Sequence, residues 1–196
     1  MATIRGNDRA NELNGTNLAD YILGLGGNDE IEGRGGDDLI DAGAGHDEVD
    51  GGAGNDRIFG RAGNDELEGG AGADRIHGEA GADQLDGDSG NDFLSGGGGN
   101  DRLDGGTGND ILLGGAGRDV FEFETDDGRG FGVDVVRDFA VNVDRLDFED
   151  LNRSYAQVMA RADQVGDDVV FNFGGAGRAT LLDVDLADLD RADFIL

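Results

Sequence analysis

The sequence predicts an all-β fold, a parallel β-solenoid whose last coil is covered by a β-rich region containing one short helix. Three observations lead to this prediction. Twelve aspartates stand nine residues apart without interruption, an aliphatic or aromatic residue follows each of them two positions later, and glycines recur at fixed positions between them. Such a repeat indicates small stacked units, each of which relies on its neighbours to bury its apolar side.

The repeating unit has nine residues, begins at Gly15 and ends, after twelve copies, at Glu122. Position one is glycine except at Ala42, and position four is glycine except at Leu18. The aspartates hold position six and are Asp20, Asp29, Asp38, Asp47, Asp56, Asp65, Asp74, Asp83, Asp92, Asp101, Asp110 and Asp119. The apolar residues hold position eight and are Ile22, Ile31, Ile40, Val49, Ile58, Leu67, Ile76, Leu85, Leu94, Leu103, Leu112 and Phe121.

Each unit reads as a turn followed by a short strand. Glycines at positions one, four and often two permit positive φ and close backbone approach, so we expect the first six residues to form a tight turn. The last three residues alternate polar, apolar and polar, which is typical of a strand with one inward side chain. Two units then complete one coil, and the interior is a stack of Ile, Leu, Val and Phe side chains between two sheets.

This geometry sorts the aspartates into two rows, one along each edge of the solenoid. The Asp20 row consists of Asp20, Asp38, Asp56, Asp74, Asp92 and Asp110. The Asp29 row consists of Asp29, Asp47, Asp65, Asp83, Asp101 and Asp119. Within a row, each carboxylate should lie above the one eighteen residues later, at the inter-strand spacing of roughly 4.8 Å.

The segments that flank the repeats are expected to cap them. Residues 1–14 form an N-terminal degenerate repeat, in which Asn11 replaces aspartate and Leu13 keeps the apolar position. Residues 15–122 are the repeat domain, and residues 123–196 form a C-terminal capping and secretion-signal region, because an uncovered last coil would leave an open sheet edge. In this region we expect strands at 133–139, 144–148, 168–173 and 179–184, and an amphipathic helix at 149–163.

Composition narrows the classes of partner. The formal net charge is −29 and all 15 cationic side chains are arginines, so nucleic acid and anionic membranes are not expected partners. Compacting so many carboxylates requires cations that neutralise them. The absence of cysteine excludes disulfides and thiolate metal sites. We also expect no Sec-type signal peptide and no membrane span, because the chain lacks the apolar runs that either would need.

The chemistry of the turns points to calcium. Calcium is a hard cation that takes six to eight oxygens from carboxylates and backbone carbonyls. A glycine-rich turn exposes its carbonyls, and the aspartate at its end supplies charge. Bare carboxylates stacked between coils repel one another, whereas a divalent cation between them forms a bridge. Six turns in each row leave five gaps, so the two rows would hold about ten Ca²⁺ ions.

The repeats match the glycine-rich pattern of calcium-binding β-helices, and the chain closely resembles the RTX (repeats-in-toxin), or haemolysin-type calcium-binding, family. The resemblance implies a right-handed parallel β-roll of about six coils. It implies calcium ligation by the position-six aspartates, Asp20 to Asp119, and by turn carbonyls. The carbonyls it assigns are those of Gly27, Gly36, Gly45, Gly54, Gly63, Gly72, Gly81, Gly90, Gly99 and Gly108. Near the first sites, Thr16, Leu18, Leu25 and Arg34 depart from the pattern.

The C-terminal region resembles the capping segment that follows RTX repeats in secreted proteases, lipases and the R-modules of mannuronan epimerases. Its end, Ala192-Asp193-Phe194-Ile195-Leu196, is similar to the acidic and then hydrophobic terminus of type I secretion substrates. This resemblance implies export from a bacterial cell by a type I secretion apparatus. The expected location is therefore extracellular.

A catalytic role is not expected. Ser89, Ser95 and Ser154 do not stand in a nucleophile-elbow pattern. His46 and His77 are expected to face solvent, and a chain without lysine has no Walker A loop. The expected function is that of a calcium-binding β-roll protein, or a module of a larger protein, that folds when it binds calcium.

Two alternatives stay open. One is a calcium-dependent module for an anionic, alginate-like polysaccharide, held by arginines of the repeats: Arg57, Arg61, Arg75, Arg102 and Arg118. The other concerns Asp126, Asp127 and Asp134, which either build a further calcium site around Gly128 to Gly130 or belong to a solvated loop.

Overall fold

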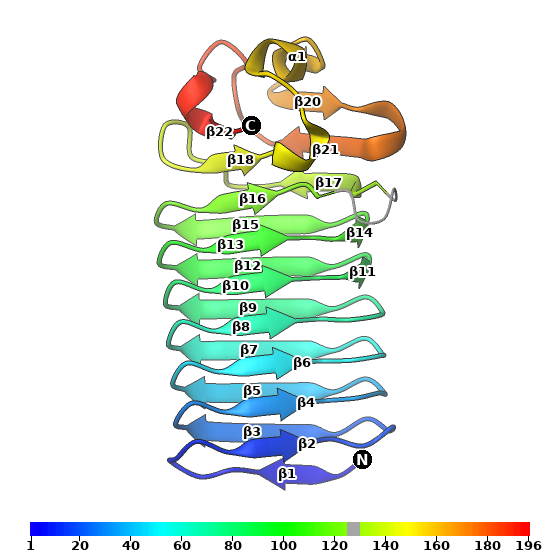
Figure 1. The fold of residues 1–196 in the computed structure, drawn as a ribbon, viewed down its shortest axis with the longest axis vertical. Coiled ribbons are helices and arrows are strands. Elements are labelled where there is room, and N and C mark those ends of the chain that lie inside the picture. The colour runs from blue at the N-terminus through cyan, green and yellow to red at the C-terminus, as the bar shows by residue number, and fades with distance from the viewer. Residues whose placement is uncertain (125–129) are drawn as a thin grey trace.

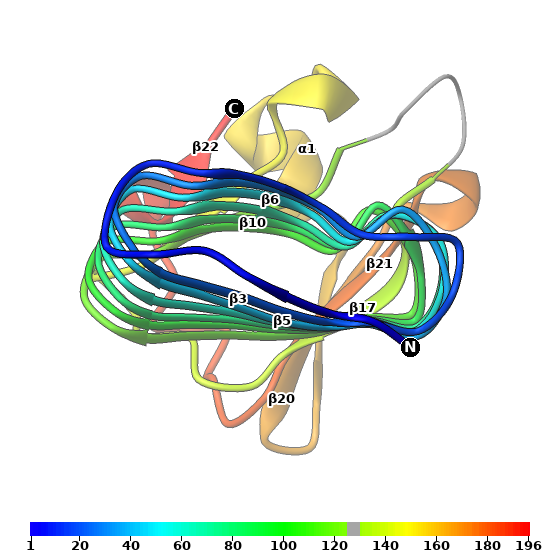
Figure 2. The same cartoon turned by 90° about the horizontal axis from the view of Figure 1, so that it is seen from below.

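The computed structural model describes residues 1–124 and 130–196. The chain folds into a parallel β-solenoid of about seven turns with a β-rich C-terminal region at one end (Figure 1). Viewed along the solenoid, the coils superimpose as two flattened layers joined by turns at two edges (Figure 2). The predicted all-β parallel solenoid is confirmed.

The larger sheet has thirteen strands in the order β1-β3-β5-β7-β9-β12-β15-β17-β21-β20-β19, with β11 and β14 pairing beside this path. Its solenoid strands are β1 (Thr3–Arg5), β3 (Tyr21–Gly26), β5 (Leu39–Ala44), β7 (Arg57–Ala62), β9 (Arg75–Ala80), β12 (Phe93–Gly98), β15 (Ile111–Ala116) and β17 (Gly132–Val136). The side strands are β11 (Ser89–Gly90) and β14 (Thr107–Gly108). The strands β21 (Gly177–Leu181), β20 (Asp168–Asn172) and β19 (Ala162–Val165) belong to the C-terminal region.

The smaller sheet has nine parallel strands in the order β2-β4-β6-β8-β10-β13-β16-β18-β22. They are β2 (Glu12–Asn14), β4 (Glu30–Glu32), β6 (Glu48–Asp50), β8 (Glu66–Glu68), β10 (Gln84–Asp86), β13 (Arg102–Asp104), β16 (Val120–Glu122), β18 (Arg145–Asp147) and β22 (Phe194–Ile195). Strand β22 therefore places the C-terminal residues of the sequence at the end of this sheet.

The register between coils is eighteen residues throughout the repeats. Ile22 pairs with Ile40 in the larger sheet, and Ile31 pairs with Val49 in the smaller sheet. The position-eight side chains consequently stack inside the solenoid, and each of them is at most 2% exposed. This interior is narrow, because each nine-residue unit contributes a single large buried apolar side chain.

The strands of the larger sheet are longer than the three residues that the repeat predicts. In β3, β5, β7, β9, β12 and β15, pairing continues through the first three residues of the following unit. The reason is that backbone N–H groups of the turn also find acceptors in the next coil, as Gly27 does with Ala44 at 2.8 Å. On the other edge, this pairing is reduced to single bridges such as Gly35 with Ala53 and to the two-residue strands β11 and β14.

Both sheets continue past the last nine-residue unit. Strand β17 pairs with β15, and β18 pairs with β16, but the steps are 24 residues (Ile111 to Val135) and 25 residues (Val120 to Arg145). An insertion between Glu122 and β17 therefore precedes one further coil. Sequence periodicity missed this coil because the spacing changes at the insertion.

The predicted helix at 149–163 is wrong in its extent. The structure has a short 3-10 helix, η2 (Glu149–Leu151), an α-helix, α1 (Tyr155–Met159), and then strand β19. Asn152 adopts a left-handed conformation with φ 48° and ends η2, while Ser154 begins α1 through a capping box with Gln157. Both devices break the helix that apolar periodicity alone favours. Two further 3-10 helices are η3 (Gly174–Ala176) and η4 (Arg191–Asp193).

An aromatic cluster closes the end of the solenoid. Phe148 lies at its centre, with ring centroids 5.0 Å from those of Phe123 and Phe173. Phe194, from β22, packs edge-on against Tyr155 of α1 at 5.4 Å. These rings cover the apolar stack that the last coil would otherwise expose. Within residues 1–124 and 130–196, no helix is long and apolar enough to cross a membrane.

Candidate metal centre

The twelve position-six aspartates lie in the turns, and all are buried, with at most 3% exposure. In each row, the main-chain N–H of one aspartate donates to Oδ1 of the aspartate eighteen residues later. These N–O distances run from 2.6 to 3.0 Å over ten pairs. One oxygen of each carboxylate therefore ties neighbouring coils together.

The second oxygen is left over. From Asp29 to Asp119, each position-six aspartate buries its Oδ2, and this atom has no hydrogen-bond partner among the described residues. Oδ2 points back over position one of its own turn, where a Cβ on Gly60 would lie 2.6 Å from Oδ2 of Asp65. Burying an ionised oxygen without a partner is strongly unfavourable. Eleven such oxygens in two rows therefore indicate ligand atoms for cations.

The turn carbonyls face the same gaps between coils. Nine of the ten glycine carbonyls predicted as ligands point toward the position-four glycine of the next coil in their row, and that of Gly108 points toward Gly132; an added Cβ at each of these glycines would contact the carbonyl oxygen. Gly54, for example, has a φ of 147° and packs against the Gly36 carbonyl. Position four thus requires glycine for two reasons, its left-handed backbone and the carbonyl oxygen beside it.

Electrostatics in the turns disfavours bare carboxylates. Burial raises the pKa of Asp56 and of Asp92 to about 7, against the hydrogen bonds that lower it, and neighbouring row aspartates raise it further. Burial likewise raises the pKa to about 6 at Asp47, Asp74, Asp83, Asp101, Asp110 and Asp119. The turns therefore favour a carboxyl group that is either protonated or paired with a cation.

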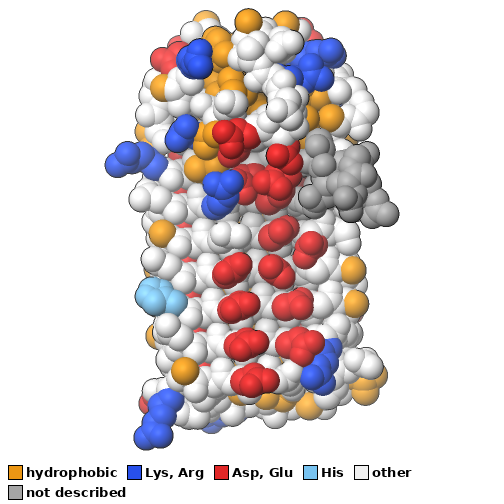
Figure 3. Space-filling model, viewed as in Figure 1, with side chains coloured by type: hydrophobic (Ala, Val, Ile, Leu, Met, Phe, Trp, Pro, Cys, Tyr) orange, Lys and Arg blue, Asp and Glu red, His pale blue; other side chains and the backbone are white. Residues whose placement is uncertain are grey.

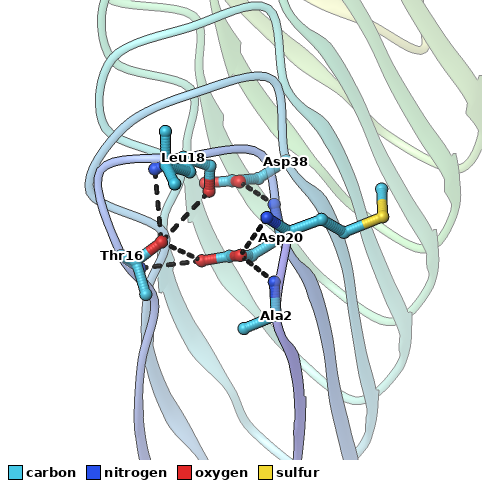
Figure 4. A network of polar contacts seen from close by, with 6 residues as sticks. Ala2, Thr16, Leu18, Asp20 and Asp38 are labelled. Carbon is cyan, nitrogen blue, oxygen red and sulfur yellow. Dashed lines mark hydrogen bonds and ion pairs between the residues drawn. The ribbon is translucent and has the colours of Figure 1, made fainter.

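The first aspartate of the Asp20 row is different, as Figure 4 shows. Its Oδ2 accepts hydrogen bonds from the main-chain N–H of Thr16 at 2.8 Å and from Thr16 Oγ1 at 2.7 Å. Hydrogen bonds from the N–H of Ala2 and from Thr16 lower the pKa of Asp20. Protein donors therefore satisfy this end of the row, where the sequence also departs from the repeat.

Asparagine side chains at position five form further hydrogen bonds between coils, which the sequence pattern did not lead us to predict. The main-chain N–H of Ala73 donates to Oδ1 of Asn55 at 2.9 Å, and Ala82 donates to Asn64 at 3.0 Å. Arg118 donates to Asn100 in the same way at 2.9 Å. The signal was present, because asparagine recurs directly before the aspartate in the repeat. These side chains hold the outer rim of the turns in register.

The outer face of the smaller sheet is acidic (Figure 3). Two columns of carboxylates run up this face, stacked in register from strand to strand. One column contains Glu12, Glu30, Glu48 and Glu66, and the other contains Glu32, Asp50, Glu68, Asp86 and Asp104. Arg102 lies at the upper end of these columns and pairs with Glu122.

The outer face of the larger sheet is aromatic and basic. The rings of Phe59 and His77 stack at 5.2 Å, and Phe93 follows 5.6 Å from His77. The guanidinium of Arg61 lies 4.8 Å from the centre of the Phe59 ring. Exposed Arg57 and Arg75 pair in register beside these rings. Arg61 also pairs with Asp41 and with Glu79, each at 2.8 Å, so this face is mixed in charge whereas the face of the smaller sheet is acidic.

The five arginines predicted to bind an anionic polysaccharide do not lie on one face. Arg57, Arg61 and Arg75 lie together on the aromatic face, whereas Arg102 lies on the acidic face and Arg118 lies in an exposed turn. His77 faces outward as expected but is half-buried between the two phenylalanines. His46 is exposed, and its Nδ1 accepts from the Asn64 N–H at 2.8 Å.

The further site considered around Gly128 lies partly outside the described residues. Asp126, Asp127, Gly128 and Arg129 belong to residues 125–129, which the structure does not describe. Asp134 is described, and it is 2% exposed. Its Oδ1 accepts the N–H of Asp110 at 3.1 Å, so it continues the Asp20 row.

The donor set of the turns fits calcium. It consists of carboxylate and carbonyl oxygens, it carries negative charge, and it is repeated between coils. Hard oxygen donors in glycine-rich turns are the ligands that Ca²⁺ takes in proteins. Cysteine is absent from the chain, and neither histidine lies at position six, so the rows do not offer the nitrogen and sulfur donors typical of zinc sites.

Sequence comparison agrees with this chemistry. The sequence model of the RTX calcium-binding nonapeptide repeat matches the chain in four copies, at residues 14–49, 50–85, 59–94 and 86–121. Together they cover more than half of the chain. A search among curated protein sequences gave no significant match.

One of the similar solved structures shares the fold. The extracellular lipase LipA from Serratia marcescens matches with a TM-score of 0.56 and 23% identity over 93% of this chain, which spans 39% of the lipase. Two repeat modules of the Azotobacter vinelandii mannuronan C5-epimerase AlgE6 also match. R3 has 30% identity over 68% of this chain and 78% of the module, and R2 has 26% over 71% and 91%. Their TM-scores are 0.37 and 0.33.

Proposed function

The chain belongs to the RTX calcium-binding nonapeptide repeat family, and we propose that it is a non-catalytic β-roll that folds when about ten Ca²⁺ ions bind between its coils. The observation that carries this proposal is the set of eleven buried, unpartnered Oδ2 atoms. A fold that buries them without a counter-charge would be opposed by desolvation and by repulsion between neighbouring carboxylates. Calcium removes both penalties.

We assign the ligands by rows. In each gap of the Asp20 row and the Asp29 row, the aspartates of two successive coils would supply carboxylate oxygens, and the position-four glycines would supply carbonyls. The bound ion supplies positive charge, and the chain supplies the spacing, the buried environment and the exclusion of water. Because the folded coils create the site, the free energy of binding adds to the free energy of folding.

This coupling would make folding depend on the surroundings. Extracellular calcium modules bind with dissociation constants of roughly 10⁻⁴–10⁻³ M. With affinities in that range, the chain would be largely unfolded where calcium is scarce and folded where it reaches millimolar concentration. Proteins with RTX repeats are typically secreted and extracellular, which supports this order of events. We propose export by a type I secretion apparatus, with the C-terminal region as its signal.

Circular dichroism tests the central proposal. The chain should show little β-signal in a calcium chelator and should gain it cooperatively as millimolar calcium is added. Magnesium at the same concentration is the control for charge screening, because its smaller ion demands a tighter octahedral shell. A chain that is already folded in chelator at pH 7.5 would overturn calcium-driven folding.

The aromatic and basic face supports a second candidate function, the binding of an anionic polysaccharide. Phe59, His77 and Phe93 form a column of neighbouring rings, and Arg57 and Arg75 place positive charge beside it in an otherwise acidic molecule. Aromatic rings can pack against sugar rings, while guanidinium groups pair with carboxylates. Calcium would be required indirectly, because it folds the sheet that carries this face.

Titration with alginate oligomers in millimolar calcium tests the second candidate. Binding should weaken in Phe93→Ala and in Arg75→Ala. Arg118→Ala, which removes an exposed arginine in a turn away from this face, is the matched control and should bind as the original chain does. Equal binding by all three variants would contradict polysaccharide binding by this face.

A further inference from the structure

The Asp20 row does not end with the repeats. Asp134 lies on strand β17, 24 residues after Asp110, and its Oδ1 accepts the main-chain N–H of Asp110 at 3.1 Å. Every other step of this row has the same bond from N–H to Oδ1, at 2.6 to 2.7 Å. Asp134 therefore occupies the place that a seventh position-six aspartate would have.

The backbone around Asp134 also repeats the turn. Gly132 has a φ of 88° and pairs in register with Gly108, and a Cβ at Gly132 would overlap the Gly108 carbonyl oxygen. Position-four glycines within the repeats show the same relation to one another. The Gly108 carbonyl consequently points into the gap between the last repeat coil and β17.

Two buried carboxyl groups border this gap. Asp110 is 1% exposed and Asp134 is 2% exposed, and the bond from the Asp110 N–H to Asp134 Oδ1 holds them in adjacent coils. Oδ2 of Asp110 has no hydrogen-bond partner among the residues that the structure describes. Two carboxylates buried side by side need a shared cation to remain ionised together.

We propose that Asp110, Asp134 and the Gly108 carbonyl hold a further calcium ion outside the nonapeptide repeats. This inference rests on the proposed function, because it assumes that equivalent gaps of the same row bind calcium. The ion would join the last repeat to the first strand of the C-terminal region across the insertion. It would thereby make the docking of that region depend on calcium.

The end of the Asp29 row provides an internal contrast. Asp144 continues this row, and its Oδ1 accepts the N–H of Asp119 at 3.0 Å. Its Oδ2, however, accepts the N–H of Ala140 at 2.8 Å. A protein donor thus occupies the oxygen that would face a cation. The Asp29 row therefore ends in a carboxylate whose two oxygens both accept hydrogen bonds from main-chain N–H groups.

Native mass spectrometry of the full chain in calcium tests the site by counting ions. Asp134→Asn keeps the acceptor for the Asp110 N–H but removes the charge, so this variant should bind one ion fewer than the original chain. Asp144→Asn is the matched control and should retain the full count. An unchanged count in Asp134→Asn would overturn the inference, whereas an original chain that binds no calcium would overturn the proposed function itself.

A second comparison avoids changing the C-terminal region. With the proposed site present, Asp110 and Asp92 each border two gaps, so Asp110→Asn and Asp92→Asn should each lose two ions. Without it, Asp110 is the last member of its row and its variant should lose one ion while Asp92→Asn loses two. This comparison decides the question even if Asp134→Asn does not fold.

Discussion

The main-chain N–H of Asp56 donates to Oδ1 of Asp74, eighteen residues later, over 2.7 Å. The same carboxylate keeps its Oδ2 inside the turn, with no partner in the described part of the chain. The two oxygens of one side chain therefore serve different purposes, one holding adjacent coils and the other facing the cation site. Asparagine retains the first oxygen and loses the second as an anion, so the two roles can be separated by mutation.

Replacing Asp65 by asparagine should remove the two calcium ions that it shares with Asp47 and Asp83. The opposite edge, between Asp56 and Asp74, should keep its ions, because its turns lie on the other side of the roll. Asp65→Ala should lose the same ions and also lose the hydrogen bond from Asp47. Ion counts by native mass spectrometry check this prediction, with exposed Glu66→Gln as a control of equal charge. A loss spread over both edges would contradict it.

Without calcium, acid should stabilise the fold. Burial raises the folded-state pKa of Asp56 and Asp92 to about 7 and that of six other row aspartates to about 6. In the unfolded chain these groups titrate near 3.8, so stability in chelator is highest below about pH 4 and is lost as pH rises toward about 7.

Circular dichroism at pH 5.0 and 7.5 checks this pH dependence. In chelator, the chain should show little β-signal at pH 7.5 and more at pH 5.0. In saturating calcium, the difference should shrink, because the ions replace the protons on the row carboxylates. A chelated chain that is more stable at pH 7.5 would contradict the prediction.

Gly72→Ala should destabilise the roll by at least about 1–3 kcal/mol, the strain typical of a residue held in an unfavourable backbone conformation. Gly72 has a φ of 144°, and a Cβ there would overlap the Gly54 carbonyl oxygen. Gly98→Ala is the matched control, since its Cβ would meet nothing closer than 3.8 Å. Chemical denaturation in saturating calcium should show Gly98→Ala to be neutral or more stable by about 0.4–1 kcal/mol.

Leu67→Ala should lower the free energy of unfolding by about 2–5 kcal/mol, the range for a large side chain removed from a packed core. Leu67 is fully buried in the apolar stack between the two sheets. Leu113→Ala removes the same atoms from a half-buried position on the outer face and should change stability by less than about 1 kcal/mol. Comparable losses in both variants would contradict the assignment of the core.

The repeat predicted the solenoid, the register and the core, because glycine, aspartate and an apolar residue recur at constant spacing. Asp134 and Asp144 were harder to place, since an insertion breaks the spacing before them and the hydrogen bonds that mark them come from distant residues. The grouping of Phe59, His77 and Phe93 also escaped prediction. These residues are separated by eighteen and sixteen positions, and only the stacking of coils brings their rings together.

The helix of the C-terminal region failed for a local reason. Apolar residues at helical spacing continue through residues 149–163, but Asn152 turns the backbone into the left-handed region and Ser154 restarts it. The chain then enters β19, whose strand pairing with β20 outweighs helical propensity. Tertiary pairing of this kind cannot be read from the periodicity of one segment.

The constant register of eighteen residues gives the molecule a natural unit of length. Each coil bonds to the coil before it and the coil after it, and the same main-chain and aspartate contacts recur at every step. Removing or duplicating one complete coil, such as residues 51–68, would restore the same main-chain and aspartate contacts at the new junction. The roll can therefore become shorter or longer by whole coils during evolution without a new kind of contact between coils.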